Sequence, residues 1–252
     1  KSLTVSGITA SDKTYDGSVT ATMDGTAAVY SGLLPGDTFD GSYTGVFSNA
    51  NVGTGKTVTI NSSYSGADVN NYTVTNQSST TADISAKALT ATASTANKTY
   101  DGGTTASTTL TFTGLVGSET LGQTVGSTFD NKNVGSNKTV TVNSITLADG
   151  SNGGLAANYS ISAGQNTTAN ITAKSLTVSG ITASNKIYDG NTVATLDPIG
   201  VTYSGIVSGD SFAGSFSGSF SDKNIGTGKT VTITSSYSGS DVSNYSVTDQ
   251  SS

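Results

Sequence analysis

Apolar residues along the chain alternate with Thr and Ser in short runs, for example where Val58 and Ile60 stand between threonines. An alternation with a period of two predicts β-strands whose apolar side chains face a core. We therefore expect Val58 and Ile60 to point inward, and Thr57 and Thr59 to point outward. By the same pattern, the strands expected in the first copy of the unit described below are 3–9, 19–22, 27–30, 38–47, 57–60, 72–75 and 82–85. No helical periodicity stands out, so the pattern predicts an all-β chain.

The whole pattern occurs three times. Residues 1–79 align with residues 174–252 without a gap, and about two thirds of the aligned positions are identical. A more distant copy lies between them, so we predict three domains over residues 1–86, 87–173 and 174–252. A period of about 86 residues is too long for one turn of a solenoid and suits a small β-sandwich.

Three short landmarks recur in the same order in every copy. They are Tyr-Asp-Gly (Tyr15, Asp16, Gly17; Tyr100, Asp101, Gly102; Tyr188, Asp189, Gly190), Asn-Val/Ile-Gly (beginning at Asn51, Asn133, Asn224) and Asn-Tyr (ending at Tyr72, Tyr159, Tyr245). Asp-Gly is typical of a type I′ hairpin turn, and the Tyr before it can cap the core while its hydroxyl reaches a backbone group. The Asn-Tyr landmark suggests a corner like the tyrosine corner of immunoglobulin-type sandwiches.

The joins between copies contain neither Gly nor Pro, and the first one runs ADISAKALTAT. A Gly/Ser linker would be flexible, whereas this join continues the strand pattern. We therefore expect each copy to be stiffly coupled to its neighbouring repeats. The third copy ends with DQSS, before the closing strand of the other two. Either the array continues, or this copy accepts a strand from elsewhere.

Composition excludes several classes of chemistry. The chain has no Cys and no His, so a Ser-His-Asp triad, a thiol nucleophile and a His/Cys zinc site cannot be built. The sequence GTGKT lacks the earlier Gly of a phosphate-binding loop, since Ala50 stands there. A net charge of −6 disfavours nucleic acid and anionic membrane surfaces, and no segment is apolar enough to insert into a bilayer. We expect no enzyme and no resident cofactor.

Taken together, the landmarks resemble the YDG/MBG repeats of bacterial surface proteins. The similarity rests on the sequences NKxYDG, SG(L/I)VxGD, FxxKNVGxxKTVTV and TANITAK, and it covers nearly the whole chain. The middle copy departs from the pattern with SETLGQTVGS and an extra loop, LADGSNGG. The resemblance implies tandem extracellular domains of adhesins and filamentous haemagglutinin-like exoproteins on the bacterial cell surface. It brings no catalytic residues.

From these observations we expect three tandem immunoglobulin-like antiparallel β-sandwiches in an elongated rod. A strand rises about 3.3 Å per residue, so three sandwiches placed end to end would have a length on the order of 100 Å. The expected function is a structural stalk or spacer that projects a binding domain from the cell. The alternative is an adhesive binding module, either for host or matrix glycans or for like molecules, including strand donation into the incomplete third repeat.

Three further sets of residues are candidates for special chemistry. Exposed aromatic platforms for a glycan could come from Tyr30, Tyr43, Tyr64, Tyr203 and Tyr237. Calcium could stiffen the joints through Asp83, Asp101 and Asp189, although no Asp-x-Asp-x-Asp-Gly loop is present. Intramolecular cross-links could use Lys13, Lys98 and Lys186, or Gln77 and Gln250, which recur in register.

Overall fold

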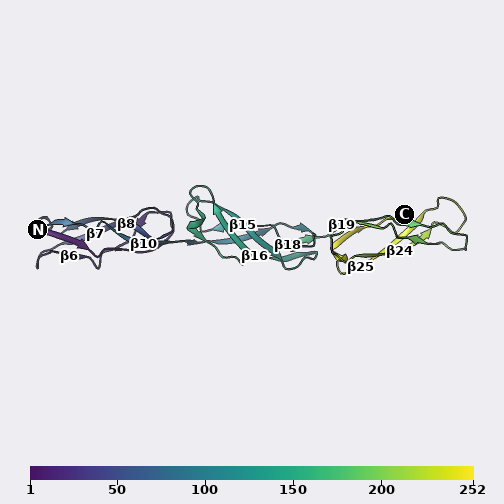
Figure 1. Ribbon diagram of the computed structural model, residues 1–252, viewed down its shortest axis with the longest axis horizontal. Coiled ribbons are helices and arrows are strands. Elements are labelled where there is room, and N and C mark those ends of the chain that lie inside the picture. Colours follow the sequence, from purple (N-terminus) through teal and green to yellow (C-terminus); the bar gives the residue numbers. More distant parts are fainter. The chain divides into compact units, whose positions relative to one another are not determined.

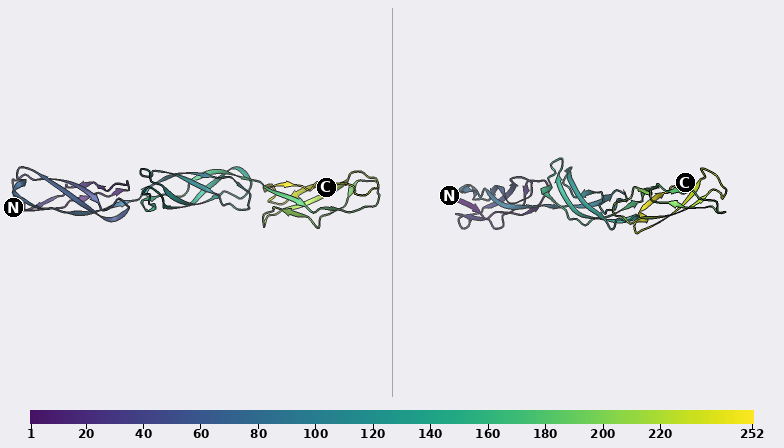
Figure 2. Two further views of the ribbon diagram at one scale, coloured as in Figure 1. Left: turned by 90° about the horizontal axis from the view of Figure 1, so that it is seen from above. Right: turned by 45° about the vertical axis from the view of Figure 1, so that its right-hand side comes forward.

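The computed structural model describes residues 1–252 and consists of β-strands, loops and three short 3-10 turns. No α-helix occurs among them, which confirms the all-β prediction (Figure 1). The two further views in Figure 2 show the same succession of strands and loops. No helix in the structure has the length and apolar character needed to cross a membrane.

The chain divides into two compact units that we describe separately. The first unit holds residues 1–92, 111–124 and 145–163, and the second holds residues 93–110, 125–144 and 164–252. Each unit therefore contains parts of two sequence copies, including one of the joins between copies.

The first copy forms two main sheets and a short ladder within the first unit. One sheet has the order β6-β1-β9, the other has the order β3-β10-β8-β7-β4, and β2 pairs with β5. These strands are β1 (Ser2–Ser6), β2 (Thr9–Ala10), β3 (Lys13–Thr14), β4 (Thr20–Ala21), β5 (Met23–Asp24), β6 (Val29–Ser31), β7 (Asp40–Phe47), β8 (Gly53–Ser65), β9 (Thr73–Thr75) and β10 (Ser79–Ser85). Leu3 and Val5 of β1 share a buried cluster with Ile60 of β8, so the core lies between the two sheets.

The second copy repeats this arrangement with longer central strands. Its sheets have the orders β11-β17, β12-β14 and β13-β18-β16-β15. The strands are β11 (Lys87–Ala88), β12 (Thr90–Thr95), β13 (Lys98–Thr99), β14 (Thr108–Thr113), β15 (Leu121–Phe129), β16 (Gly135–Asp149), β17 (Tyr159–Ser160) and β18 (Asn166–Thr172).

The third copy lies in the second unit. Its sheets have the orders β23-β19-β26, β20-β22 and β21-β24-β25. The strands are β19 (Lys174–Ser179), β20 (Thr182–Ala183), β21 (Val193–Ala194), β22 (Leu196–Asp197), β23 (Thr202–Ser204), β24 (Ala213–Phe220), β25 (Val231–Ser238) and β26 (Tyr245–Thr248). A 3-10 turn precedes the Asn-Tyr tyrosine of each copy: η1 (Val69–Asn71), η2 (Ala156–Asn158) and η3 (Val242–Asn244).

The inward and outward positions follow the alternation of the sequence. Val58 and Ile60 are buried, and Thr57 and Thr59 are exposed, as predicted. The strand that contains them is longer than the expected 57–60, because β7 and β8 pair in one antiparallel hairpin from Asp40↔Ser65 to Phe47↔Val58. The polar residues after Ile60 hide this extension from a hydrophobic pattern.

Five strand pairs depart from the expected antiparallel arrangement, and those of the second and third copies are β11 with β17, β13 with β18 and β19 with β26. β1 pairs with β9, and β10 pairs with β3, in parallel. The expectation of a purely antiparallel sandwich is therefore wrong at these edges. The chain between the two members of each pair runs through most of the copy, which is long enough for the crossover that a parallel pair needs.

The Tyr-Asp-Gly landmark does not form the type I′ hairpin turn that we expected. A type I′ turn needs positive φ at two successive residues, and here Gly17 has a φ of +76° whereas Asp16 does not have a positive φ. The flanking strands also belong to different pairs, because β3 pairs with β10 and β4 pairs with β7. The landmark instead links two strands that are not neighbours.

Both joins between copies are almost continuous strand, as predicted. β10 ends at Ser85 and β11 begins at Lys87; β18 ends at Thr172 and β19 begins at Lys174. One residue separates the strands in each case. Ile84 before the first join and Leu89 after it belong to one buried cluster, so the chain stays packed while it passes from one copy to the next.

Candidate functional site

The recurrent landmarks gather where one copy meets the next. We call each such meeting place a joint, and the first joint lies within the first unit. There the hydroxyl of Tyr15, in the first copy, donates a hydrogen bond to Oε1 of Glu119 at 2.7 Å. Tyr159 of the second copy donates to Oε2 of the same carboxylate at 2.6 Å. The two rings pack edge to face with centroids 5.4 Å apart. One carboxylate thus connects a phenol from each copy.

Tyr159 is held in place by the backbone of its own copy. The N–H of Val116 donates to the Tyr159 hydroxyl oxygen at 2.9 Å. The same bond is made by Leu34 N–H to Tyr72 at 3.0 Å and by Val207 N–H to Tyr245 at 2.8 Å. The Asn-Tyr tyrosine therefore caps a turn 38 to 43 residues upstream. This differs from the tyrosine corner that we expected, in which the bond reaches backbone only a few residues upstream.

The second joint, within the second unit, repeats the first. Tyr100 of the second copy donates to Oδ2 of Asp210 at 2.8 Å, and Tyr245 of the third copy donates to the same atom at 2.5 Å. Their ring centroids are 5.6 Å apart, again edge to face. Asp210 takes the place of Glu119, and its side chain is only 3% exposed. The hydroxyl of the Tyr-Asp-Gly tyrosine thus reaches a carboxylate of the following copy, not the backbone group that we expected.

The Asp of the Tyr-Asp-Gly landmark shapes the loop that carries the Tyr. Asp16 accepts the N–H of Ser18 at 2.8 Å and pairs with Lys13 Nζ at 2.7 Å. Lys13 also donates to the Ser18 carbonyl at 2.8 Å, which ties strand β3 to the loop. The equivalent ion pairs are Lys98–Asp101 at 2.7 Å and Lys186–Asp189 at 2.8 Å.

The Gly of the landmark is required both by its own backbone and by the neighbouring copy. Gly17 and Gly102 have φ values of +76° and +80°, which L side chains rarely adopt. A Cβ on Gly17 would lie 2.9 Å from Cγ1 of Val116, and a Cβ on Gly102 would lie 2.8 Å from Cγ1 of Val207. Both valines belong to the following copy, so the glycine allows close packing across the joint.

The Asn-Val/Ile-Gly and Asn-Tyr landmarks also meet across each joint. At the first joint, Asn158 is 1% exposed and accepts the Val52 N–H at 2.9 Å. At the second joint, Asn244 is equally buried and accepts the Val134 N–H at 2.9 Å. A buried amide costs free energy unless it is hydrogen-bonded. These two asparagines find that partner in the preceding copy.

Each joint is surrounded by a hydrophobic cluster to which both copies contribute. At the first joint, Tyr15, Phe47, Val58 and Ile84 of the first copy share a cluster with Leu89 and Tyr159 of the second. At the second joint, Tyr100, Phe129, Val140 and Ile171 of the second copy share one with Leu176, Val178 and Tyr245 of the third. Bending at a joint would expose this apolar surface to water.

The surroundings of the tyrosines keep their hydroxyls protonated. Burial and the hydrogen bond to Glu119 raise the pKa of Tyr15 to about 12. Burial and the hydrogen bond to Asp210 raise the pKa of Tyr245 to about 12 as well. Burial alone would raise the pKa of Asp210, but the hydrogen bonds that it receives hold that pKa below its usual value.

The second joint has an ion-pair network that the first joint lacks. Lys132 Nζ lies 3.1 Å from Asp210 and 2.8 Å from Asp241, and these two carboxylates hold the pKa of Lys132 above its usual value. The hydrogen bond from Lys132 lowers the pKa of Asp241 to about 2. In the first joint Ala50 stands at the position of Lys132, and Leu155 stands at the position of Asp241. The first joint therefore lacks both the lysine and the second carboxylate of this network.

The two landmarks at the outer ends have only half of these contacts. In the first copy, Tyr72 donates to Asp37 at 2.6 Å, without a second tyrosine. In the third copy, Tyr188 is 57% exposed, whereas Tyr15 and Tyr100 are 4% and 1% exposed. A Cβ on Gly190 would meet no atom within 4 Å. The Tyr-Asp-Gly landmark is thus buried at the two joints, where it packs against a second copy.

The three aspartates considered for calcium serve local structure. Asp83 accepts the Gly55 N–H at 2.7 Å. Asp101 and Asp189 each pair with the lysine three residues earlier. No group of three acidic, His or Cys side chains lies close enough together to hold a metal ion, so the structure brings no calcium ligand set together from these residues.

The five candidate tyrosine platforms are half-buried rather than exposed. Tyr30 and Tyr43 join their hydroxyls at 2.9 Å, Tyr64 donates to Asn76 at 2.8 Å, and Tyr237 donates to Asp249. Rings of Tyr30 and Tyr64 pack on Phe39 with centroids 5.2 Å and 5.0 Å away. Their arrangement is that of an aromatic cluster on a sandwich rather than a free stacking face.

The residues considered for cross-links also have structural partners. The Gln77 amide accepts the Ile8 N–H at 2.9 Å and donates to the Ile8 carbonyl at 2.7 Å, and Gln250 does the same with Ile181. This two-bond pairing with one backbone residue explains why the glutamines recur in register. The three lysines are the partners of the Tyr-Asp-Gly aspartates.

Three joint residues were not singled out from the sequence: Glu119, Asp210 and Lys132. A signal was present, since the chain's single Glu occupies the position held by Asp37 and Asp210 in the other copies. The segment SETLGQ differs from the other copies at most positions but keeps an acidic residue at this one. That could have indicated that the carboxylate has the same role in every copy.

Comparison with known proteins gives one kind of match. The family model described as YDG domain matches residues 1–82, 85–169 and 172–252. Neither the curated proteins nor the solved structures gave a match. The three matched segments cover nearly the whole chain and bring the tyrosine landmarks with them. The chain therefore belongs to the YDG domain family, of which it carries three tandem copies.

Proposed function

We propose that the chain is a semi-rigid structural spacer of an extracellular bacterial adhesin or surface filament. The observation that carries this proposal is that the recurrent landmarks of the sequence converge on the joints. A Tyr from one copy and a Tyr from the next share one carboxylate, at 2.7 and 2.6 Å in the first joint. Both joints are built from the same landmarks, so a role in coupling neighbouring copies accounts for the recurrence of these residues.

Stiffness is the property that such joints supply. Each joint combines a nearly continuous strand, a shared apolar cluster and buried hydrogen bonds between copies. Domains linked only by a chain are expected to move relative to one another, unless the interface between them is large and apolar. These joints favour a stalk over a set of independently tumbling modules, and the location on a bacterial surface is part of the proposal.

Small-angle X-ray scattering of the 252-residue chain, with calcium and then with a chelator, tests this function. We expect a stiff, extended particle with a maximum dimension on the order of 100 Å in both conditions. A Tyr15→Ala, Tyr100→Ala double variant should show the added flexibility of loosened joints. A particle that is compact or flexible in both conditions would overturn the spacer function. A particle that is extended only with calcium would make metal ions part of it.

A further inference from the structure

The extra loop of the middle copy, residues 147–154, contacts the turn that carries the shared carboxylate of the first joint. The side chain of Asn152 donates from Nδ2 to the Ser118 carbonyl at 3.0 Å. Glu119, the next residue, is the acid that accepts a tyrosine hydroxyl from each of the two copies. The loop therefore holds the turn that presents Glu119 to the joint.

The other two copies anchor the same segment with a carboxylate. In the third copy the N–H of Ser211, the residue after the shared acid, donates to Asp241 at 3.0 Å, and the first copy has the equivalent bond. The middle copy has Leu155 in place of this aspartate. Its equivalent N–H, that of Thr120, donates to the Ser151 carbonyl of the extra loop at 3.2 Å. Uncharged groups of the loop have thus replaced an acid as the anchor.

Asn152 is also the single asparagine of the chain that is followed by a glycine. In an Asn-Gly sequence the backbone nitrogen of the glycine can attack the side-chain carbonyl carbon, because no Cβ shields the nitrogen or restricts the backbone. Asn152 and Gly153 are both exposed, and a Cβ on Gly153 would meet no atom within 4 Å. The Gly153 N–H makes no hydrogen bond to another backbone group. The attacking nitrogen is therefore open to hydroxide.

We propose that Asn152 is a site of spontaneous deamidation, and that its conversion weakens the hold of the loop on the Glu119 turn. The Gly153 amide loses its proton to base, and its nitrogen forms a bond to Cγ of Asn152. The Cγ–Nδ2 bond breaks, and Nδ2 takes a proton from water and leaves as ammonia. Water then opens the cyclic imide to give aspartate or isoaspartate.

This reaction consumes one water and releases one ammonia, without any change of oxidation state. It therefore needs no enzyme, cofactor or oxidant. The site is independent of the spacer function, since the reaction requires only the loop.

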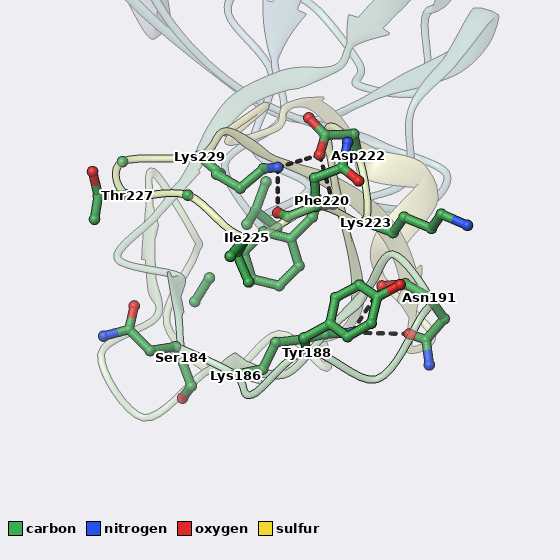
Figure 3. A pocket seen from close by; sticks show the side chains of 16 residues that line it. Ser184, Lys186, Tyr188, Asn191, Phe220, Asp222, Lys223, Ile225, Thr227 and Lys229 are labelled. Carbon is green, nitrogen blue, oxygen red and sulfur yellow. Dashed lines mark hydrogen bonds and ion pairs between the residues drawn. The ribbon is translucent and has the colours of Figure 1, made fainter.

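Asn191 of the third copy shows why other exposed asparagines should react more slowly. Its Oδ1 accepts from Lys186 Nζ at 2.9 Å and from the Val193 N–H at 3.0 Å, at the edge of a surface pocket (Figure 3). The residue that follows is Thr192, whose branched Cβ lies beside the nitrogen that would have to attack. Asn191 therefore serves as a reference for Asn152.

Deamidation changes what position 152 offers to the Ser118 carbonyl. The Nδ2 donor is replaced by an oxygen, and an ionised carboxylate accepts hydrogen bonds but donates none. The product also adds a second carboxylate near Glu119, and like charges repel. An isoaspartate would in addition lengthen the backbone of the loop by one carbon. Each change should leave Glu119 less firmly held after the reaction.

Mass spectrometry of the ageing 252-residue chain tests the site. The folded protein is kept in mildly alkaline buffer, digested at intervals, and sequenced by fragmentation. We expect Asn152 to exchange NH for O before Asn191 does, at a rate that rises with the hydroxide concentration. Labelling with an isoaspartate methyltransferase should mark the same position. Earlier reaction at Asn191, or a rate at Asn152 that does not depend on pH, would overturn the assignment.

Asn152→Gln is the matched control for the chemistry. Glutamine keeps the amide, but its ring closure needs a larger and less favourable ring. The variant should therefore keep its mass at position 152 over the time in which the parent chain reacts. Equal loss of ammonia from position 152 in this variant would show that the Asn-Gly sequence is not the cause.

Asn152→Asp tests the effect on the first joint. Aspartate tolerates the φ of +56° at this position, so the variant should fold. Hydrogen exchange of the Val52 amide should become roughly two- to tenfold faster, as expected for the loss of one hydrogen bond between neutral groups. The Val134 amide of the second joint should be unchanged.

Asn191→Asp makes the same change of charge away from both joints and should leave the Val52 exchange as in the parent. Equal Val52 exchange in the two aspartate variants would overturn the effect on the joint, whether or not Asn152 deamidates.

Discussion

Tyr15 and Glu119 are 104 positions apart in the sequence, yet the hydroxyl of one donates to the carboxylate of the other at 2.7 Å. The bond crosses from the first copy to the second, and Tyr159 approaches the same carboxylate from the other side. A hydrogen bond to a charged group contributes about 1.5–3 kcal/mol. The YDG tyrosine is therefore a residue of the joint as much as of its own sandwich.

Removing this hydroxyl should loosen the first joint. Tyr15→Phe leaves the ring and its edge-to-face contact but removes a bond to a carboxylate, at a cost of about 1.5–3 kcal/mol. Hydrogen exchange of the Val52 amide reports joint opening, because that N–H bonds to Asn158 of the next copy. We expect its exchange to become roughly tenfold faster or more, since 1.4 kcal/mol is a factor of about ten.

The third copy provides the control for this variant. Tyr188→Phe changes the equivalent tyrosine where it is exposed and has no carboxylate partner, so exchange at Val52 and Val134 should stay as in the parent protein. If Tyr15→Phe left the Val52 exchange unchanged too, the Tyr15–Glu119 bond would not contribute to the coupling of the first two copies.

The YDG glycine gives a second matched pair. Gly17→Ala and Gly190→Ala both place a side chain on a backbone with positive φ, at +76° and +80°, and both should cost about 1 kcal/mol for that reason. Only the Cβ on Gly17 also meets Val116 of the next copy, at 2.9 Å. Gly17→Ala should therefore lower the thermal unfolding midpoint of the chain more than Gly190→Ala does.

Equal effects of the two substitutions would mean that backbone strain accounts for the glycine and that the joint adds nothing. Scattering adds an independent readout, because Gly17→Ala should also broaden the distribution of particle dimensions, and Gly190→Ala should not.

Much of the fold could be predicted from the sequence because strand positions and the joins depend on residues that are close together along the chain. Alternation placed Val58 and Ile60 inward, and the Gly-free join predicted the short break between Ser85 and Lys87. The parallel pairs, such as β1 with β9, were missed because they depend on which distant edges meet. The joint was missed for the same reason. Tyr15 looked like the Tyr of a hairpin, since its partner Glu119 belongs to another copy and no local pattern connects them.

Alkaline pH should weaken both joints. The pKa of Tyr15 and that of Tyr245 are raised to about 12, above the usual value of 10.0. The native state thus binds these protons more tightly than the unfolded state does, so their contribution is complete below pH 10 and is lost as pH rises toward 12. Thermal midpoints followed by circular dichroism should fall in this window. The fall should be smaller in a Tyr15→Phe, Tyr245→Phe double variant, and an equal fall would assign the alkaline loss to other groups.

Acid should affect the second joint through Lys132. The hydrogen bond from this lysine lowers the pKa of Asp241 from 3.8 to about 2. A lowered pKa in the native state means that the contribution of Asp241 is complete above pH 3.8 and is lost as pH falls toward 2. Protection of the Val134 amide against hydrogen exchange should decline over this range. Lys132→Met should return the pKa of Asp241 toward its usual value, which carbon NMR of the carboxylate measures directly.

Because Ala50 takes the place of Lys132 at the first joint, protection of the Val52 amide should be the same in the variant and the parent. An unmoved Asp241 pKa in Lys132→Met would show that the ion pair does not stabilise the second joint.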